Sequence, residues 1–151
     1  RWPPATIVMP PLTRWHIKTA FVCLALAMTV GLALALAGVL NLPDWVVYLN
    51  PAFFHLLMVG WVTQMIFGVI FWMFPIITRA QPRGSERLGW ATYVLLNGGL
   101  ALRVLSEPAN AVAPGGGWGW ALVASALMQW LAAVFFVVNS WPRVKEKYRG
   151  E

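Results

Sequence analysis

The stretch PAFFHLLMVGWVTQMIFGVIFWMFPIITR, residues 51–79, decides the fold, because it is a long apolar run that carries a single imidazole near its start. A helix that crosses a membrane needs about 20 predominantly apolar residues, since the hydrocarbon layer is about 30 Å thick. No charged residue interrupts this run before Arg79. The stretch therefore predicts a transmembrane helix, and it raises the question of what His55 does inside one.

The composition of the whole chain is that of a membrane protein. Of its 151 residues, 60% are hydrophobic and 11% are charged, and the mean hydropathy is +0.67. These values lie outside the range of soluble globular domains. We expect an all-α integral membrane protein, an up-and-down four-helix bundle in which residues 1–151 form a single membrane domain. The predicted transmembrane helices cover residues 17–40, 51–77, 88–105 and 118–140.

Proline, glycine and capping residues separate these windows. NLPD (41–44) ends the first window, Pro51 starts the second, and Ser85 is the expected N-cap of the third. The segment EPANAVAPGGGWG (107–119) is so rich in Pro and Gly that we expect a surface loop there. The first window is too long for the apolar part of a cleaved signal peptide, so we expect a retained helix. Its lone Cys23 excludes an intrachain disulfide and is expected to pack as a small apolar residue.

The basic residues fall on one side of the predicted path. Short cytoplasmic loops accumulate Lys and Arg, so we expect both termini in the cytoplasm of a multi-pass protein in a bacterial-type inner membrane. The opposite side carries Asp44 and Glu107, with Arg103 as its only nearby base. This asymmetry accounts for the net charge of +6, so no nucleic-acid partner is expected. The cytoplasmic side carries Arg1, Arg14, Lys18, Arg79, Arg83, Arg87, Arg143, Lys145, Lys147 and Arg149.

His55 is the candidate functional residue, because an ionisable side chain inside a membrane span usually faces the bundle interior or a cofactor. Such a residue is either a metal ligand or a neutral imidazole that bonds to a carbonyl of a neighbouring helix, and the spacing leaves both open. An apolar, polarizable wall would suit a porphyrin, although a methionine stripe is more often simple packing. At 100° per residue the His55 face carries Met58, Val59, Val62, Ile66, Val69 and Met73.

Arg103 is predicted to lie near His55, because antiparallel neighbours bring the start of the second helix beside the end of the third. Its guanidinium could hold a haem propionate through paired charge-assisted bonds. Alternatively it pairs with Glu107, four residues on, if the helix extends that far, and the two arrangements can coexist. His16 is expected to be an interfacial residue at the opposite mouth, too far from His55 to share one iron within a chain.

The sequence HLLMVGWVTQMIFGVIFWMFPIITRAQPR (55–83) resembles the second-helix region of haem-copper oxidase subunit I-like proteins, especially the short four-helix cbb3-type or cytochrome oxidase subunit I homologues. The stretches IKTAFVCLALAMTVGLALAL (17–36) and GWATYVLLNGGLALRVLSEP (89–108) are similar to the first and third helices of those proteins, so the likeness covers residues 14–108. The resemblance implies that His55 is an axial ligand of a low-spin haem b near the outer face.

The chain also departs from that family. Complete oxidase subunits have many more helices, which supply the second haem ligand and the copper-site histidines. This chain has no other intramembrane histidine and no histidine cluster for copper, so we do not expect it to reduce oxygen alone. The opposing haem ligand is absent, is a methionine, or comes from elsewhere, such as a second copy of His55 in a symmetric dimer. Met58 is excluded because it shares the helix face of His55. Met28 and Met128, in the first and fourth helices, are expected nearer to the middle of the membrane than His55, and a shift of a few residues in the helix boundaries would be needed for either to serve.

We therefore expect a haem-b-binding electron-transfer subunit of a respiratory or related membrane complex. His55 is the expected metal ligand, Arg103 the propionate partner, and the expected lining is Met58, Val59, Val62 and Ile66. The expected partners are the lipid bilayer and either other membrane subunits or a second copy.

Two alternatives remain open. The chain is a pigment-binding subunit in which His55 ligates the magnesium of a bacteriochlorophyll, or a non-redox accessory subunit that packs against larger membrane partners. The small residues that would allow close helix approach are Gly31, Ala35, Gly38, Gly60 and Gly68.

Overall fold

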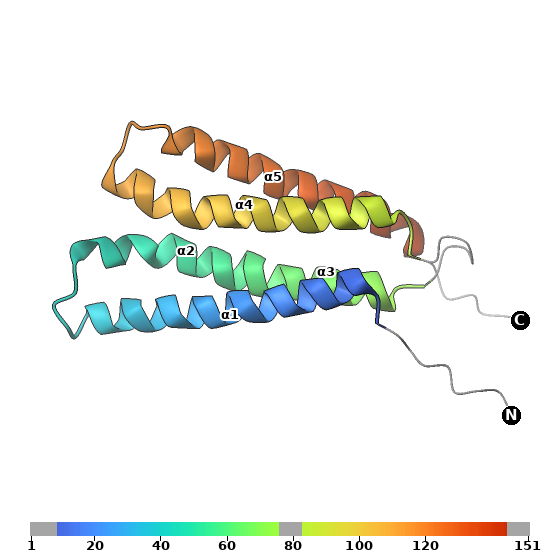
Figure 1. Ribbon diagram of the computed structural model, residues 1–151, viewed down its shortest axis with the longest axis horizontal. Helices are drawn as coiled ribbons and strands as arrows, with labels where there is room; N and C mark the ends of the chain where they lie inside the picture. Colours follow the sequence, from blue (N-terminus) through green and yellow to red (C-terminus); the bar gives the residue numbers. More distant parts are fainter. Residues whose placement is uncertain (1–8, 76–82, 145–151) are drawn as a thin grey trace, which may run out of the picture.

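The computed structural model describes residues 9–75 and 83–144, in which every regular element is helical. Helix α1 (Pro11–Ala37) is followed by a composite second rod, then by α4 (Glu86–Val112), α5 (Trp118–Ser140) and the short η3 (Trp141–Arg143). The rods alternate in direction, so that α1 begins and α5 ends at the same end of the molecule (Figure 1). Four helical segments are long and apolar enough to cross a membrane: Pro11–Ala37, Asp44–Met73, Glu86–Val112 and Trp118–Arg143.

The second rod joins four segments with three kinds of helical turn end to end. It runs through the 3-10 helix η1 (Asp44–Leu49), α2 (Asn50–His55), the π-helix η2 (Leu56–Thr63) and α3 (Gln64–Met73). A π-helix closes its hydrogen bonds over five residues instead of four. The Thr63 hydroxyl follows that spacing, because it donates to the Met58 carbonyl at 2.8 Å. A count of 100° per residue therefore does not hold across this rod.

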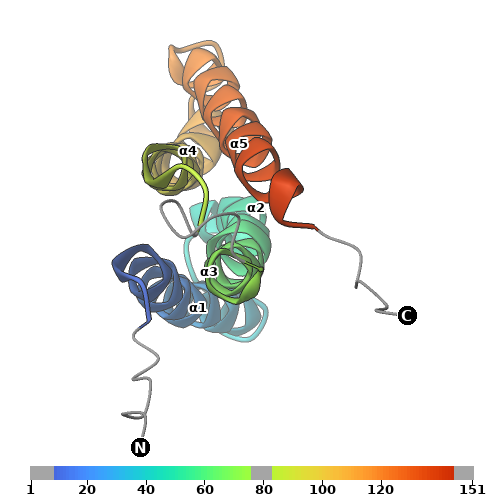
Figure 2. The ribbon, with the colours of Figure 1, turned by 90° about the vertical axis from the view of Figure 1, so that its right-hand side faces the viewer.

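The four rods form two hairpins. Helix α1 packs along η2 and α3, while α4 packs along α5, and the hairpins meet where α2 and η1 contact α4 (Figure 2). A buried cluster of Cys23 and Ala27 from α1, Leu56 from η2 and Leu100 from α4 lies where the hairpins join. This is an up-and-down arrangement in which packing follows chain order.

Two glycines of the second rod allow α1 to approach closely. A Cβ at Gly60 would lie 2.7 Å from the Cys23 Cβ, and a Cβ at Gly68 would lie 2.8 Å from the His16 Cβ. Gly31 of α1 likewise faces the Phe53 ring, whereas a Cβ at Gly38 would meet only the carbonyl of Ala35 in its own helix. Three of the small residues that we expected to serve partner docking are therefore used inside the chain.

The predicted loop at 107–119 is wrong over its first part. Helix α4 continues to Val112 with Pro108 inside it. A proline in a helix interior loses one backbone hydrogen bond and normally ends the helix. Here the last turns of α4 pack against η1, and Glu107 bonds to His55 of α2, so tertiary contacts hold the helix together.

Other helix boundaries differ from prediction by less. Helix α1 begins at Pro11 instead of residue 17, and the predicted fourth helix, 118–140, agrees with α5. Ser85 is the N-cap of α4, as predicted, and its hydroxyl accepts from the Leu88 amide at 3.3 Å. The second predicted span, 51–77, is wrong at its end, because α3 stops at Met73 and Phe74 is extended. The following predicted basic residues lie outside the described residues: Arg1, Arg79, Lys145, Lys147 and Arg149.

Arg143, which we assigned to the basic cytoplasmic side, is buried at 1% exposure beside the end of α3. Its Nε donates to the Pro75 carbonyl at 3.1 Å and its Nη2 to the Phe74 carbonyl at 2.7 Å. Carbonyls at the C-terminal end of a helix lack intrahelical hydrogen-bond donors, and this guanidinium donates to two of them. The same group lies 5.9 Å from the ring centroids of Phe71 and Phe74. Arg143 therefore fastens the end of α5 to the end of α3.

Replacement of Arg143 is expected to destabilise the fold. Because two charge-assisted hydrogen bonds to carbonyls are lost, Arg143→Ala should lower the free energy of unfolding by about 3 kcal/mol. Arg143→Lys keeps the charge but not the planar fork, so its effect should be intermediate. Unfolding in mixed micelles, followed by far-ultraviolet circular dichroism, measures both. Arg14→Ala removes an exposed arginine from the same end of the molecule and is the matched control. Equal losses for Arg14→Ala and Arg143→Ala would contradict the capping role.

Candidate functional site

Three ionisable side chains gather where α2 faces α4. His55 is the last residue of α2, and Arg103 and Glu107 lie one turn apart on α4. The His55 Nδ1 lies 3.1 Å from the Glu107 Oε2, and the Arg103 Nη1 lies 3.3 Å from the His55 Nε2 and 3.7 Å from the Glu107 Oε1. All three are largely buried, with side-chain exposures of 27%, 20% and 13% for His55, Arg103 and Glu107. The structure thus brings Arg103 to His55, and it also shows the Arg103–Glu107 pair that a longer helix allows.

The hydrogen bonds of His55 determine where its proton resides. Its Nδ1 lies 2.9 Å from the Pro51 carbonyl, in addition to the Glu107 carboxylate. Carbonyl and carboxylate oxygens only accept, so Nδ1 carries the hydrogen, and Nε2 keeps a lone pair that accepts from Arg103. The sequence alternative of an imidazole bonded to a carbonyl of a neighbouring helix is only partly right. The carbonyl belongs to Pro51 of the same helix, and the neighbouring helix supplies the carboxylate of Glu107 instead.

A buried serine extends the cluster to α5. The Arg103 Nε donates to the Ser125 Oγ at 3.2 Å, and that hydroxyl donates to the Gly99 carbonyl at 2.7 Å. Ser125 is 0% exposed, so these bonds are shielded from solvent. His55, Glu107, Arg103 and Ser125, here called the His55 cluster, therefore connect α2, α4 and α5. Chemically, the cluster presents one unprotonated imidazole nitrogen beside a guanidinium.

The predicted lining residues do not share one buried face with His55. Met58 is 53% exposed and Ile66 is 48% exposed on the outer surface of the rod. Val59 instead packs against the buried cluster beside α1, and Val62 is partly buried. The π-helix between His55 and Gln64 explains the difference, because its wider turns shift the angular positions that the 100° count assumed.

The arrangement fits a haem ligand in one respect and requires a change in another. Histidines that bind metals usually donate their other ring N–H to a carboxylate or carbonyl, as His55 does here. However, the Nε2 lone pair already accepts from Arg103, so the guanidinium would have to move to free it. Met28 is 50% exposed on α1, and Met128 packs beside Gly98 of α4. Across residues 9–75 and 83–144, no group of three or more His, Cys, Asp and Glu side chains is placed to hold a metal ion.

His16 lies far from His55, as predicted, but it is not interfacial. It packs against Gly68, which is 13 residues beyond His55 on the second rod, or roughly 20 Å at 1.5 Å per residue. Its side chain is only 2% exposed, so the interfacial assignment is wrong. A signal for burial was present in the sequence. The residues at helical spacing on the same face of α1 are small and buried: Thr13, Ala20, Cys23 and Ala27.

The amide side chains of Gln64, Asn97 and Gln129 form no hydrogen bond to another helix among the described residues. The Asn97 Nδ2 donates to the Tyr93 carbonyl of its own helix at 2.8 Å. Gln64 is 0% exposed, and neither of its amide atoms has a hydrogen-bond partner in the described part of the chain. The Gln129 Nε2 is also buried without one there.

Comparison with known proteins found no matching family model, no matching curated protein and no matching solved structure. The function is therefore argued from the chain's own residues.

Proposed function

We propose that the chain is a multi-pass subunit of a bacterial-type inner membrane, with the start of α1 and the end of α5 on the cytoplasmic side. Four segments of suitable length and hydropathy support the insertion. The charge distribution supports the orientation, because cytoplasmic ends of membrane helices are rich in Lys and Arg. Asp44 and Glu107 lie toward the opposite end. The described basic residues near the start of α1 and its neighbouring helix ends are Arg14, Lys18, Arg83, Arg87 and Arg143.

Cysteine labelling measures this orientation. In a Cys23→Ala background, single cysteines replace the exposed Asn41 and Ala113 in the two turns of one end, and the exposed Glu86 at the other end. A membrane-impermeant maleimide added to spheroplasts should label the first two variants. It should label Glu86→Cys only after the membrane is permeabilised. Labelling of Glu86→Cys in intact spheroplasts would reverse the proposed orientation.

We propose further that this subunit binds one b-type haem through His55 and takes part in electron transfer. The observation that carries the proposal is the bonding of Nδ1 to Glu107 and Pro51, which holds the ring and leaves a lone pair on Nε2. Arg103 would pair with a propionate once it leaves Nε2, and Ser125 would steady its guanidinium. The haem supplies a one-electron carrier, and its burial in a medium of low polarity adjusts its potential.

Two of the expected lining residues, Met58 and Ile66, are exposed, so they do not enclose a group bound at His55 within the chain. Because Met58 and Ile66 face outward, a group bound against them would lie between this chain and a neighbour. Any further ligand to the iron would then come from a second copy of the chain or from another membrane subunit.

A spectrum tests the haem proposal. The protein purified from haem-supplied cells should show a b-type band in the reduced-minus-oxidised absorption spectrum. His55→Ala removes the ligand nitrogen and should abolish the band, whereas His16→Ala, the matched control on α1, should retain it. A colourless wild-type protein, or a band that survives in His55→Ala, would falsify the proposal. A far-red band that depends on His55 would instead support the pigment-binding alternative.

A second candidate function is that of a non-redox accessory subunit. The specific observation in its favour is that the His55 cluster is complete within the chain, because both ring nitrogens of His55 have partners. In this role the cluster serves only to hold α2 against α4. Breaking one partner of a buried polar pair is destabilising even when the pair contributes little net stability.

A double-mutant cycle measures how strongly the cluster joins the helices. His55→Ala, Glu107→Ala and the double variant are unfolded in mixed micelles, and the coupling free energy is calculated from the four stabilities. Because the two side chains are in direct contact, we expect a coupling of about 1 to 3 kcal/mol. Thr29, which bonds only within α1, supplies the control when it is paired with Glu107. A His55–Glu107 coupling no larger than that of the control pair would show that the contact does not join the hairpins.

A further inference from the structure

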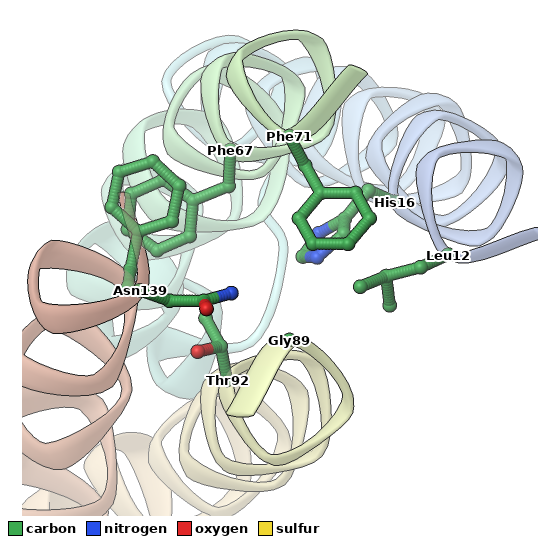
Figure 3. Close-up of a pocket in the computed structure, with 8 residues that line it drawn as sticks. Leu12, His16, Phe67, Phe71, Gly89, Thr92 and Asn139 are labelled. Carbon is green, nitrogen blue, oxygen red and sulfur yellow. The ribbon is translucent and has the colours of Figure 1, made fainter. Parts of the chain in front are cut away.

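The further inference concerns the opposite end of the molecule, where a small cavity lies among four helices. Its volume is about 10 Å³, and α1, α3, α4 and α5 all contribute to its wall. Figure 3 shows His16 and Asn139 directed toward a common space with Thr92 beside them. Apolar side chains, among them Leu12, Phe67 and Phe71, form most of the remaining lining.

One buried atom in this wall lacks a partner. The His16 Nδ1 makes no hydrogen bond with any described residue, although the side chain is only 2% exposed. A buried polar atom without a partner is destabilising, so it requires an explanation.

The two other polar side chains have unused bonding capacity toward the cavity. The Thr92 hydroxyl donates to the Leu88 carbonyl at 2.9 Å, which leaves its oxygen lone pairs free to accept. The Asn139 Oδ1 accepts from the Ser85 amide at 2.8 Å, which leaves the Nδ2 hydrogens free to donate. Both side chains are more than nine-tenths buried. Together with the His16 Nδ1, the wall therefore presents two acceptors and one donor.

We propose that one water molecule occupies this cavity and bridges His16, Thr92 and Asn139. It donates to the His16 Nδ1 and to the Thr92 Oγ1, and it accepts from the Asn139 Nδ2. A cavity needs about 10 to 15 Å³ and two to four polar partners to hold one water. This one lies at the lower limit of volume and offers three polar partners. No anionic side chain lines the cavity among the described residues, so the wall suits a neutral ligand instead of a cation. The water joins α1, α4 and α5 at the end where α1 begins.

The experiment uses the full chain in lipid bilayers with ¹⁵N-labelled histidine. The chain has only two histidines, so His55→Ala assigns the signals of His16. Solid-state NMR then measures magnetisation transfer from water protons to the His16 Nδ1. We expect transfer in the wild type and its loss in Thr92→Val. Thr29→Val is the matched control, because Thr29 also bonds to a carbonyl four residues earlier but is exposed on α1. It should leave the transfer unchanged.

The absence of transfer in the wild type, or equal transfer in Thr92→Val, would overturn the proposal. Thermal stability provides a second readout if a variant folds poorly. Both Thr→Val variants lose the same bond within the helix, so a bridging water predicts a lower unfolding temperature for Thr92→Val than for Thr29→Val. A dry cavity predicts the reverse, because the added methyl group fills empty space. Thr92→Ser keeps the hydroxyl and should restore the transfer.

Discussion

The two helical hairpins of this chain are fastened to each other by polar contacts at both ends. At one end, His55 of α2 bonds to Glu107 of α4. At the other end, Arg143 after α5 bonds to the carbonyls that follow α3. In a bilayer the hydrophobic effect does not drive helices together, because lipid chains are as apolar as the side chains. Close packing and interhelical hydrogen bonds therefore determine which helices associate more than they do in water. These contacts select how α1 and the second rod meet α4 and α5.

The sequence was sufficient to predict the helices but not how they face one another. Apolar windows located four spans, and the window at 118–140 coincides with α5. The end of α4 was missed because the Pro and Gly signals after residue 106 are local, while the contact of Glu107 with His55 is not. The burial of His16 was readable from the small-residue face of α1. The π-helix was not, because no residue in LLMVGWVT marks a change of helical period, and the positions of Met58 and Ile66 depend on it.

The two functions proposed for the His55 cluster use the same hydrogen bonds and differ in one position. In both, the carboxylate of Glu107 and the carbonyl of Pro51 hold the ring by Nδ1. What differs is the group opposite Nε2, which is Arg103 in an accessory subunit and a metal in a haem protein. Arg103 is suited to both states, because it is already bonded to Ser125 and can turn its remaining N–H groups toward an anion.

The π-helix η2 also limits how this protein can tolerate changes in length. Its eight residues separate His55, which bonds to Glu107 of α4, from Gly68, which packs against His16 of α1. A residue inserted within α3 would rotate Gly68 away from His16 by about 100°, and a side chain would then meet the α1 backbone. Inside η2, one residue can be lost or gained by exchange between π and α turns. A change of length at η2 would therefore alter the orientation of His55 relative to Gly68 along the rod.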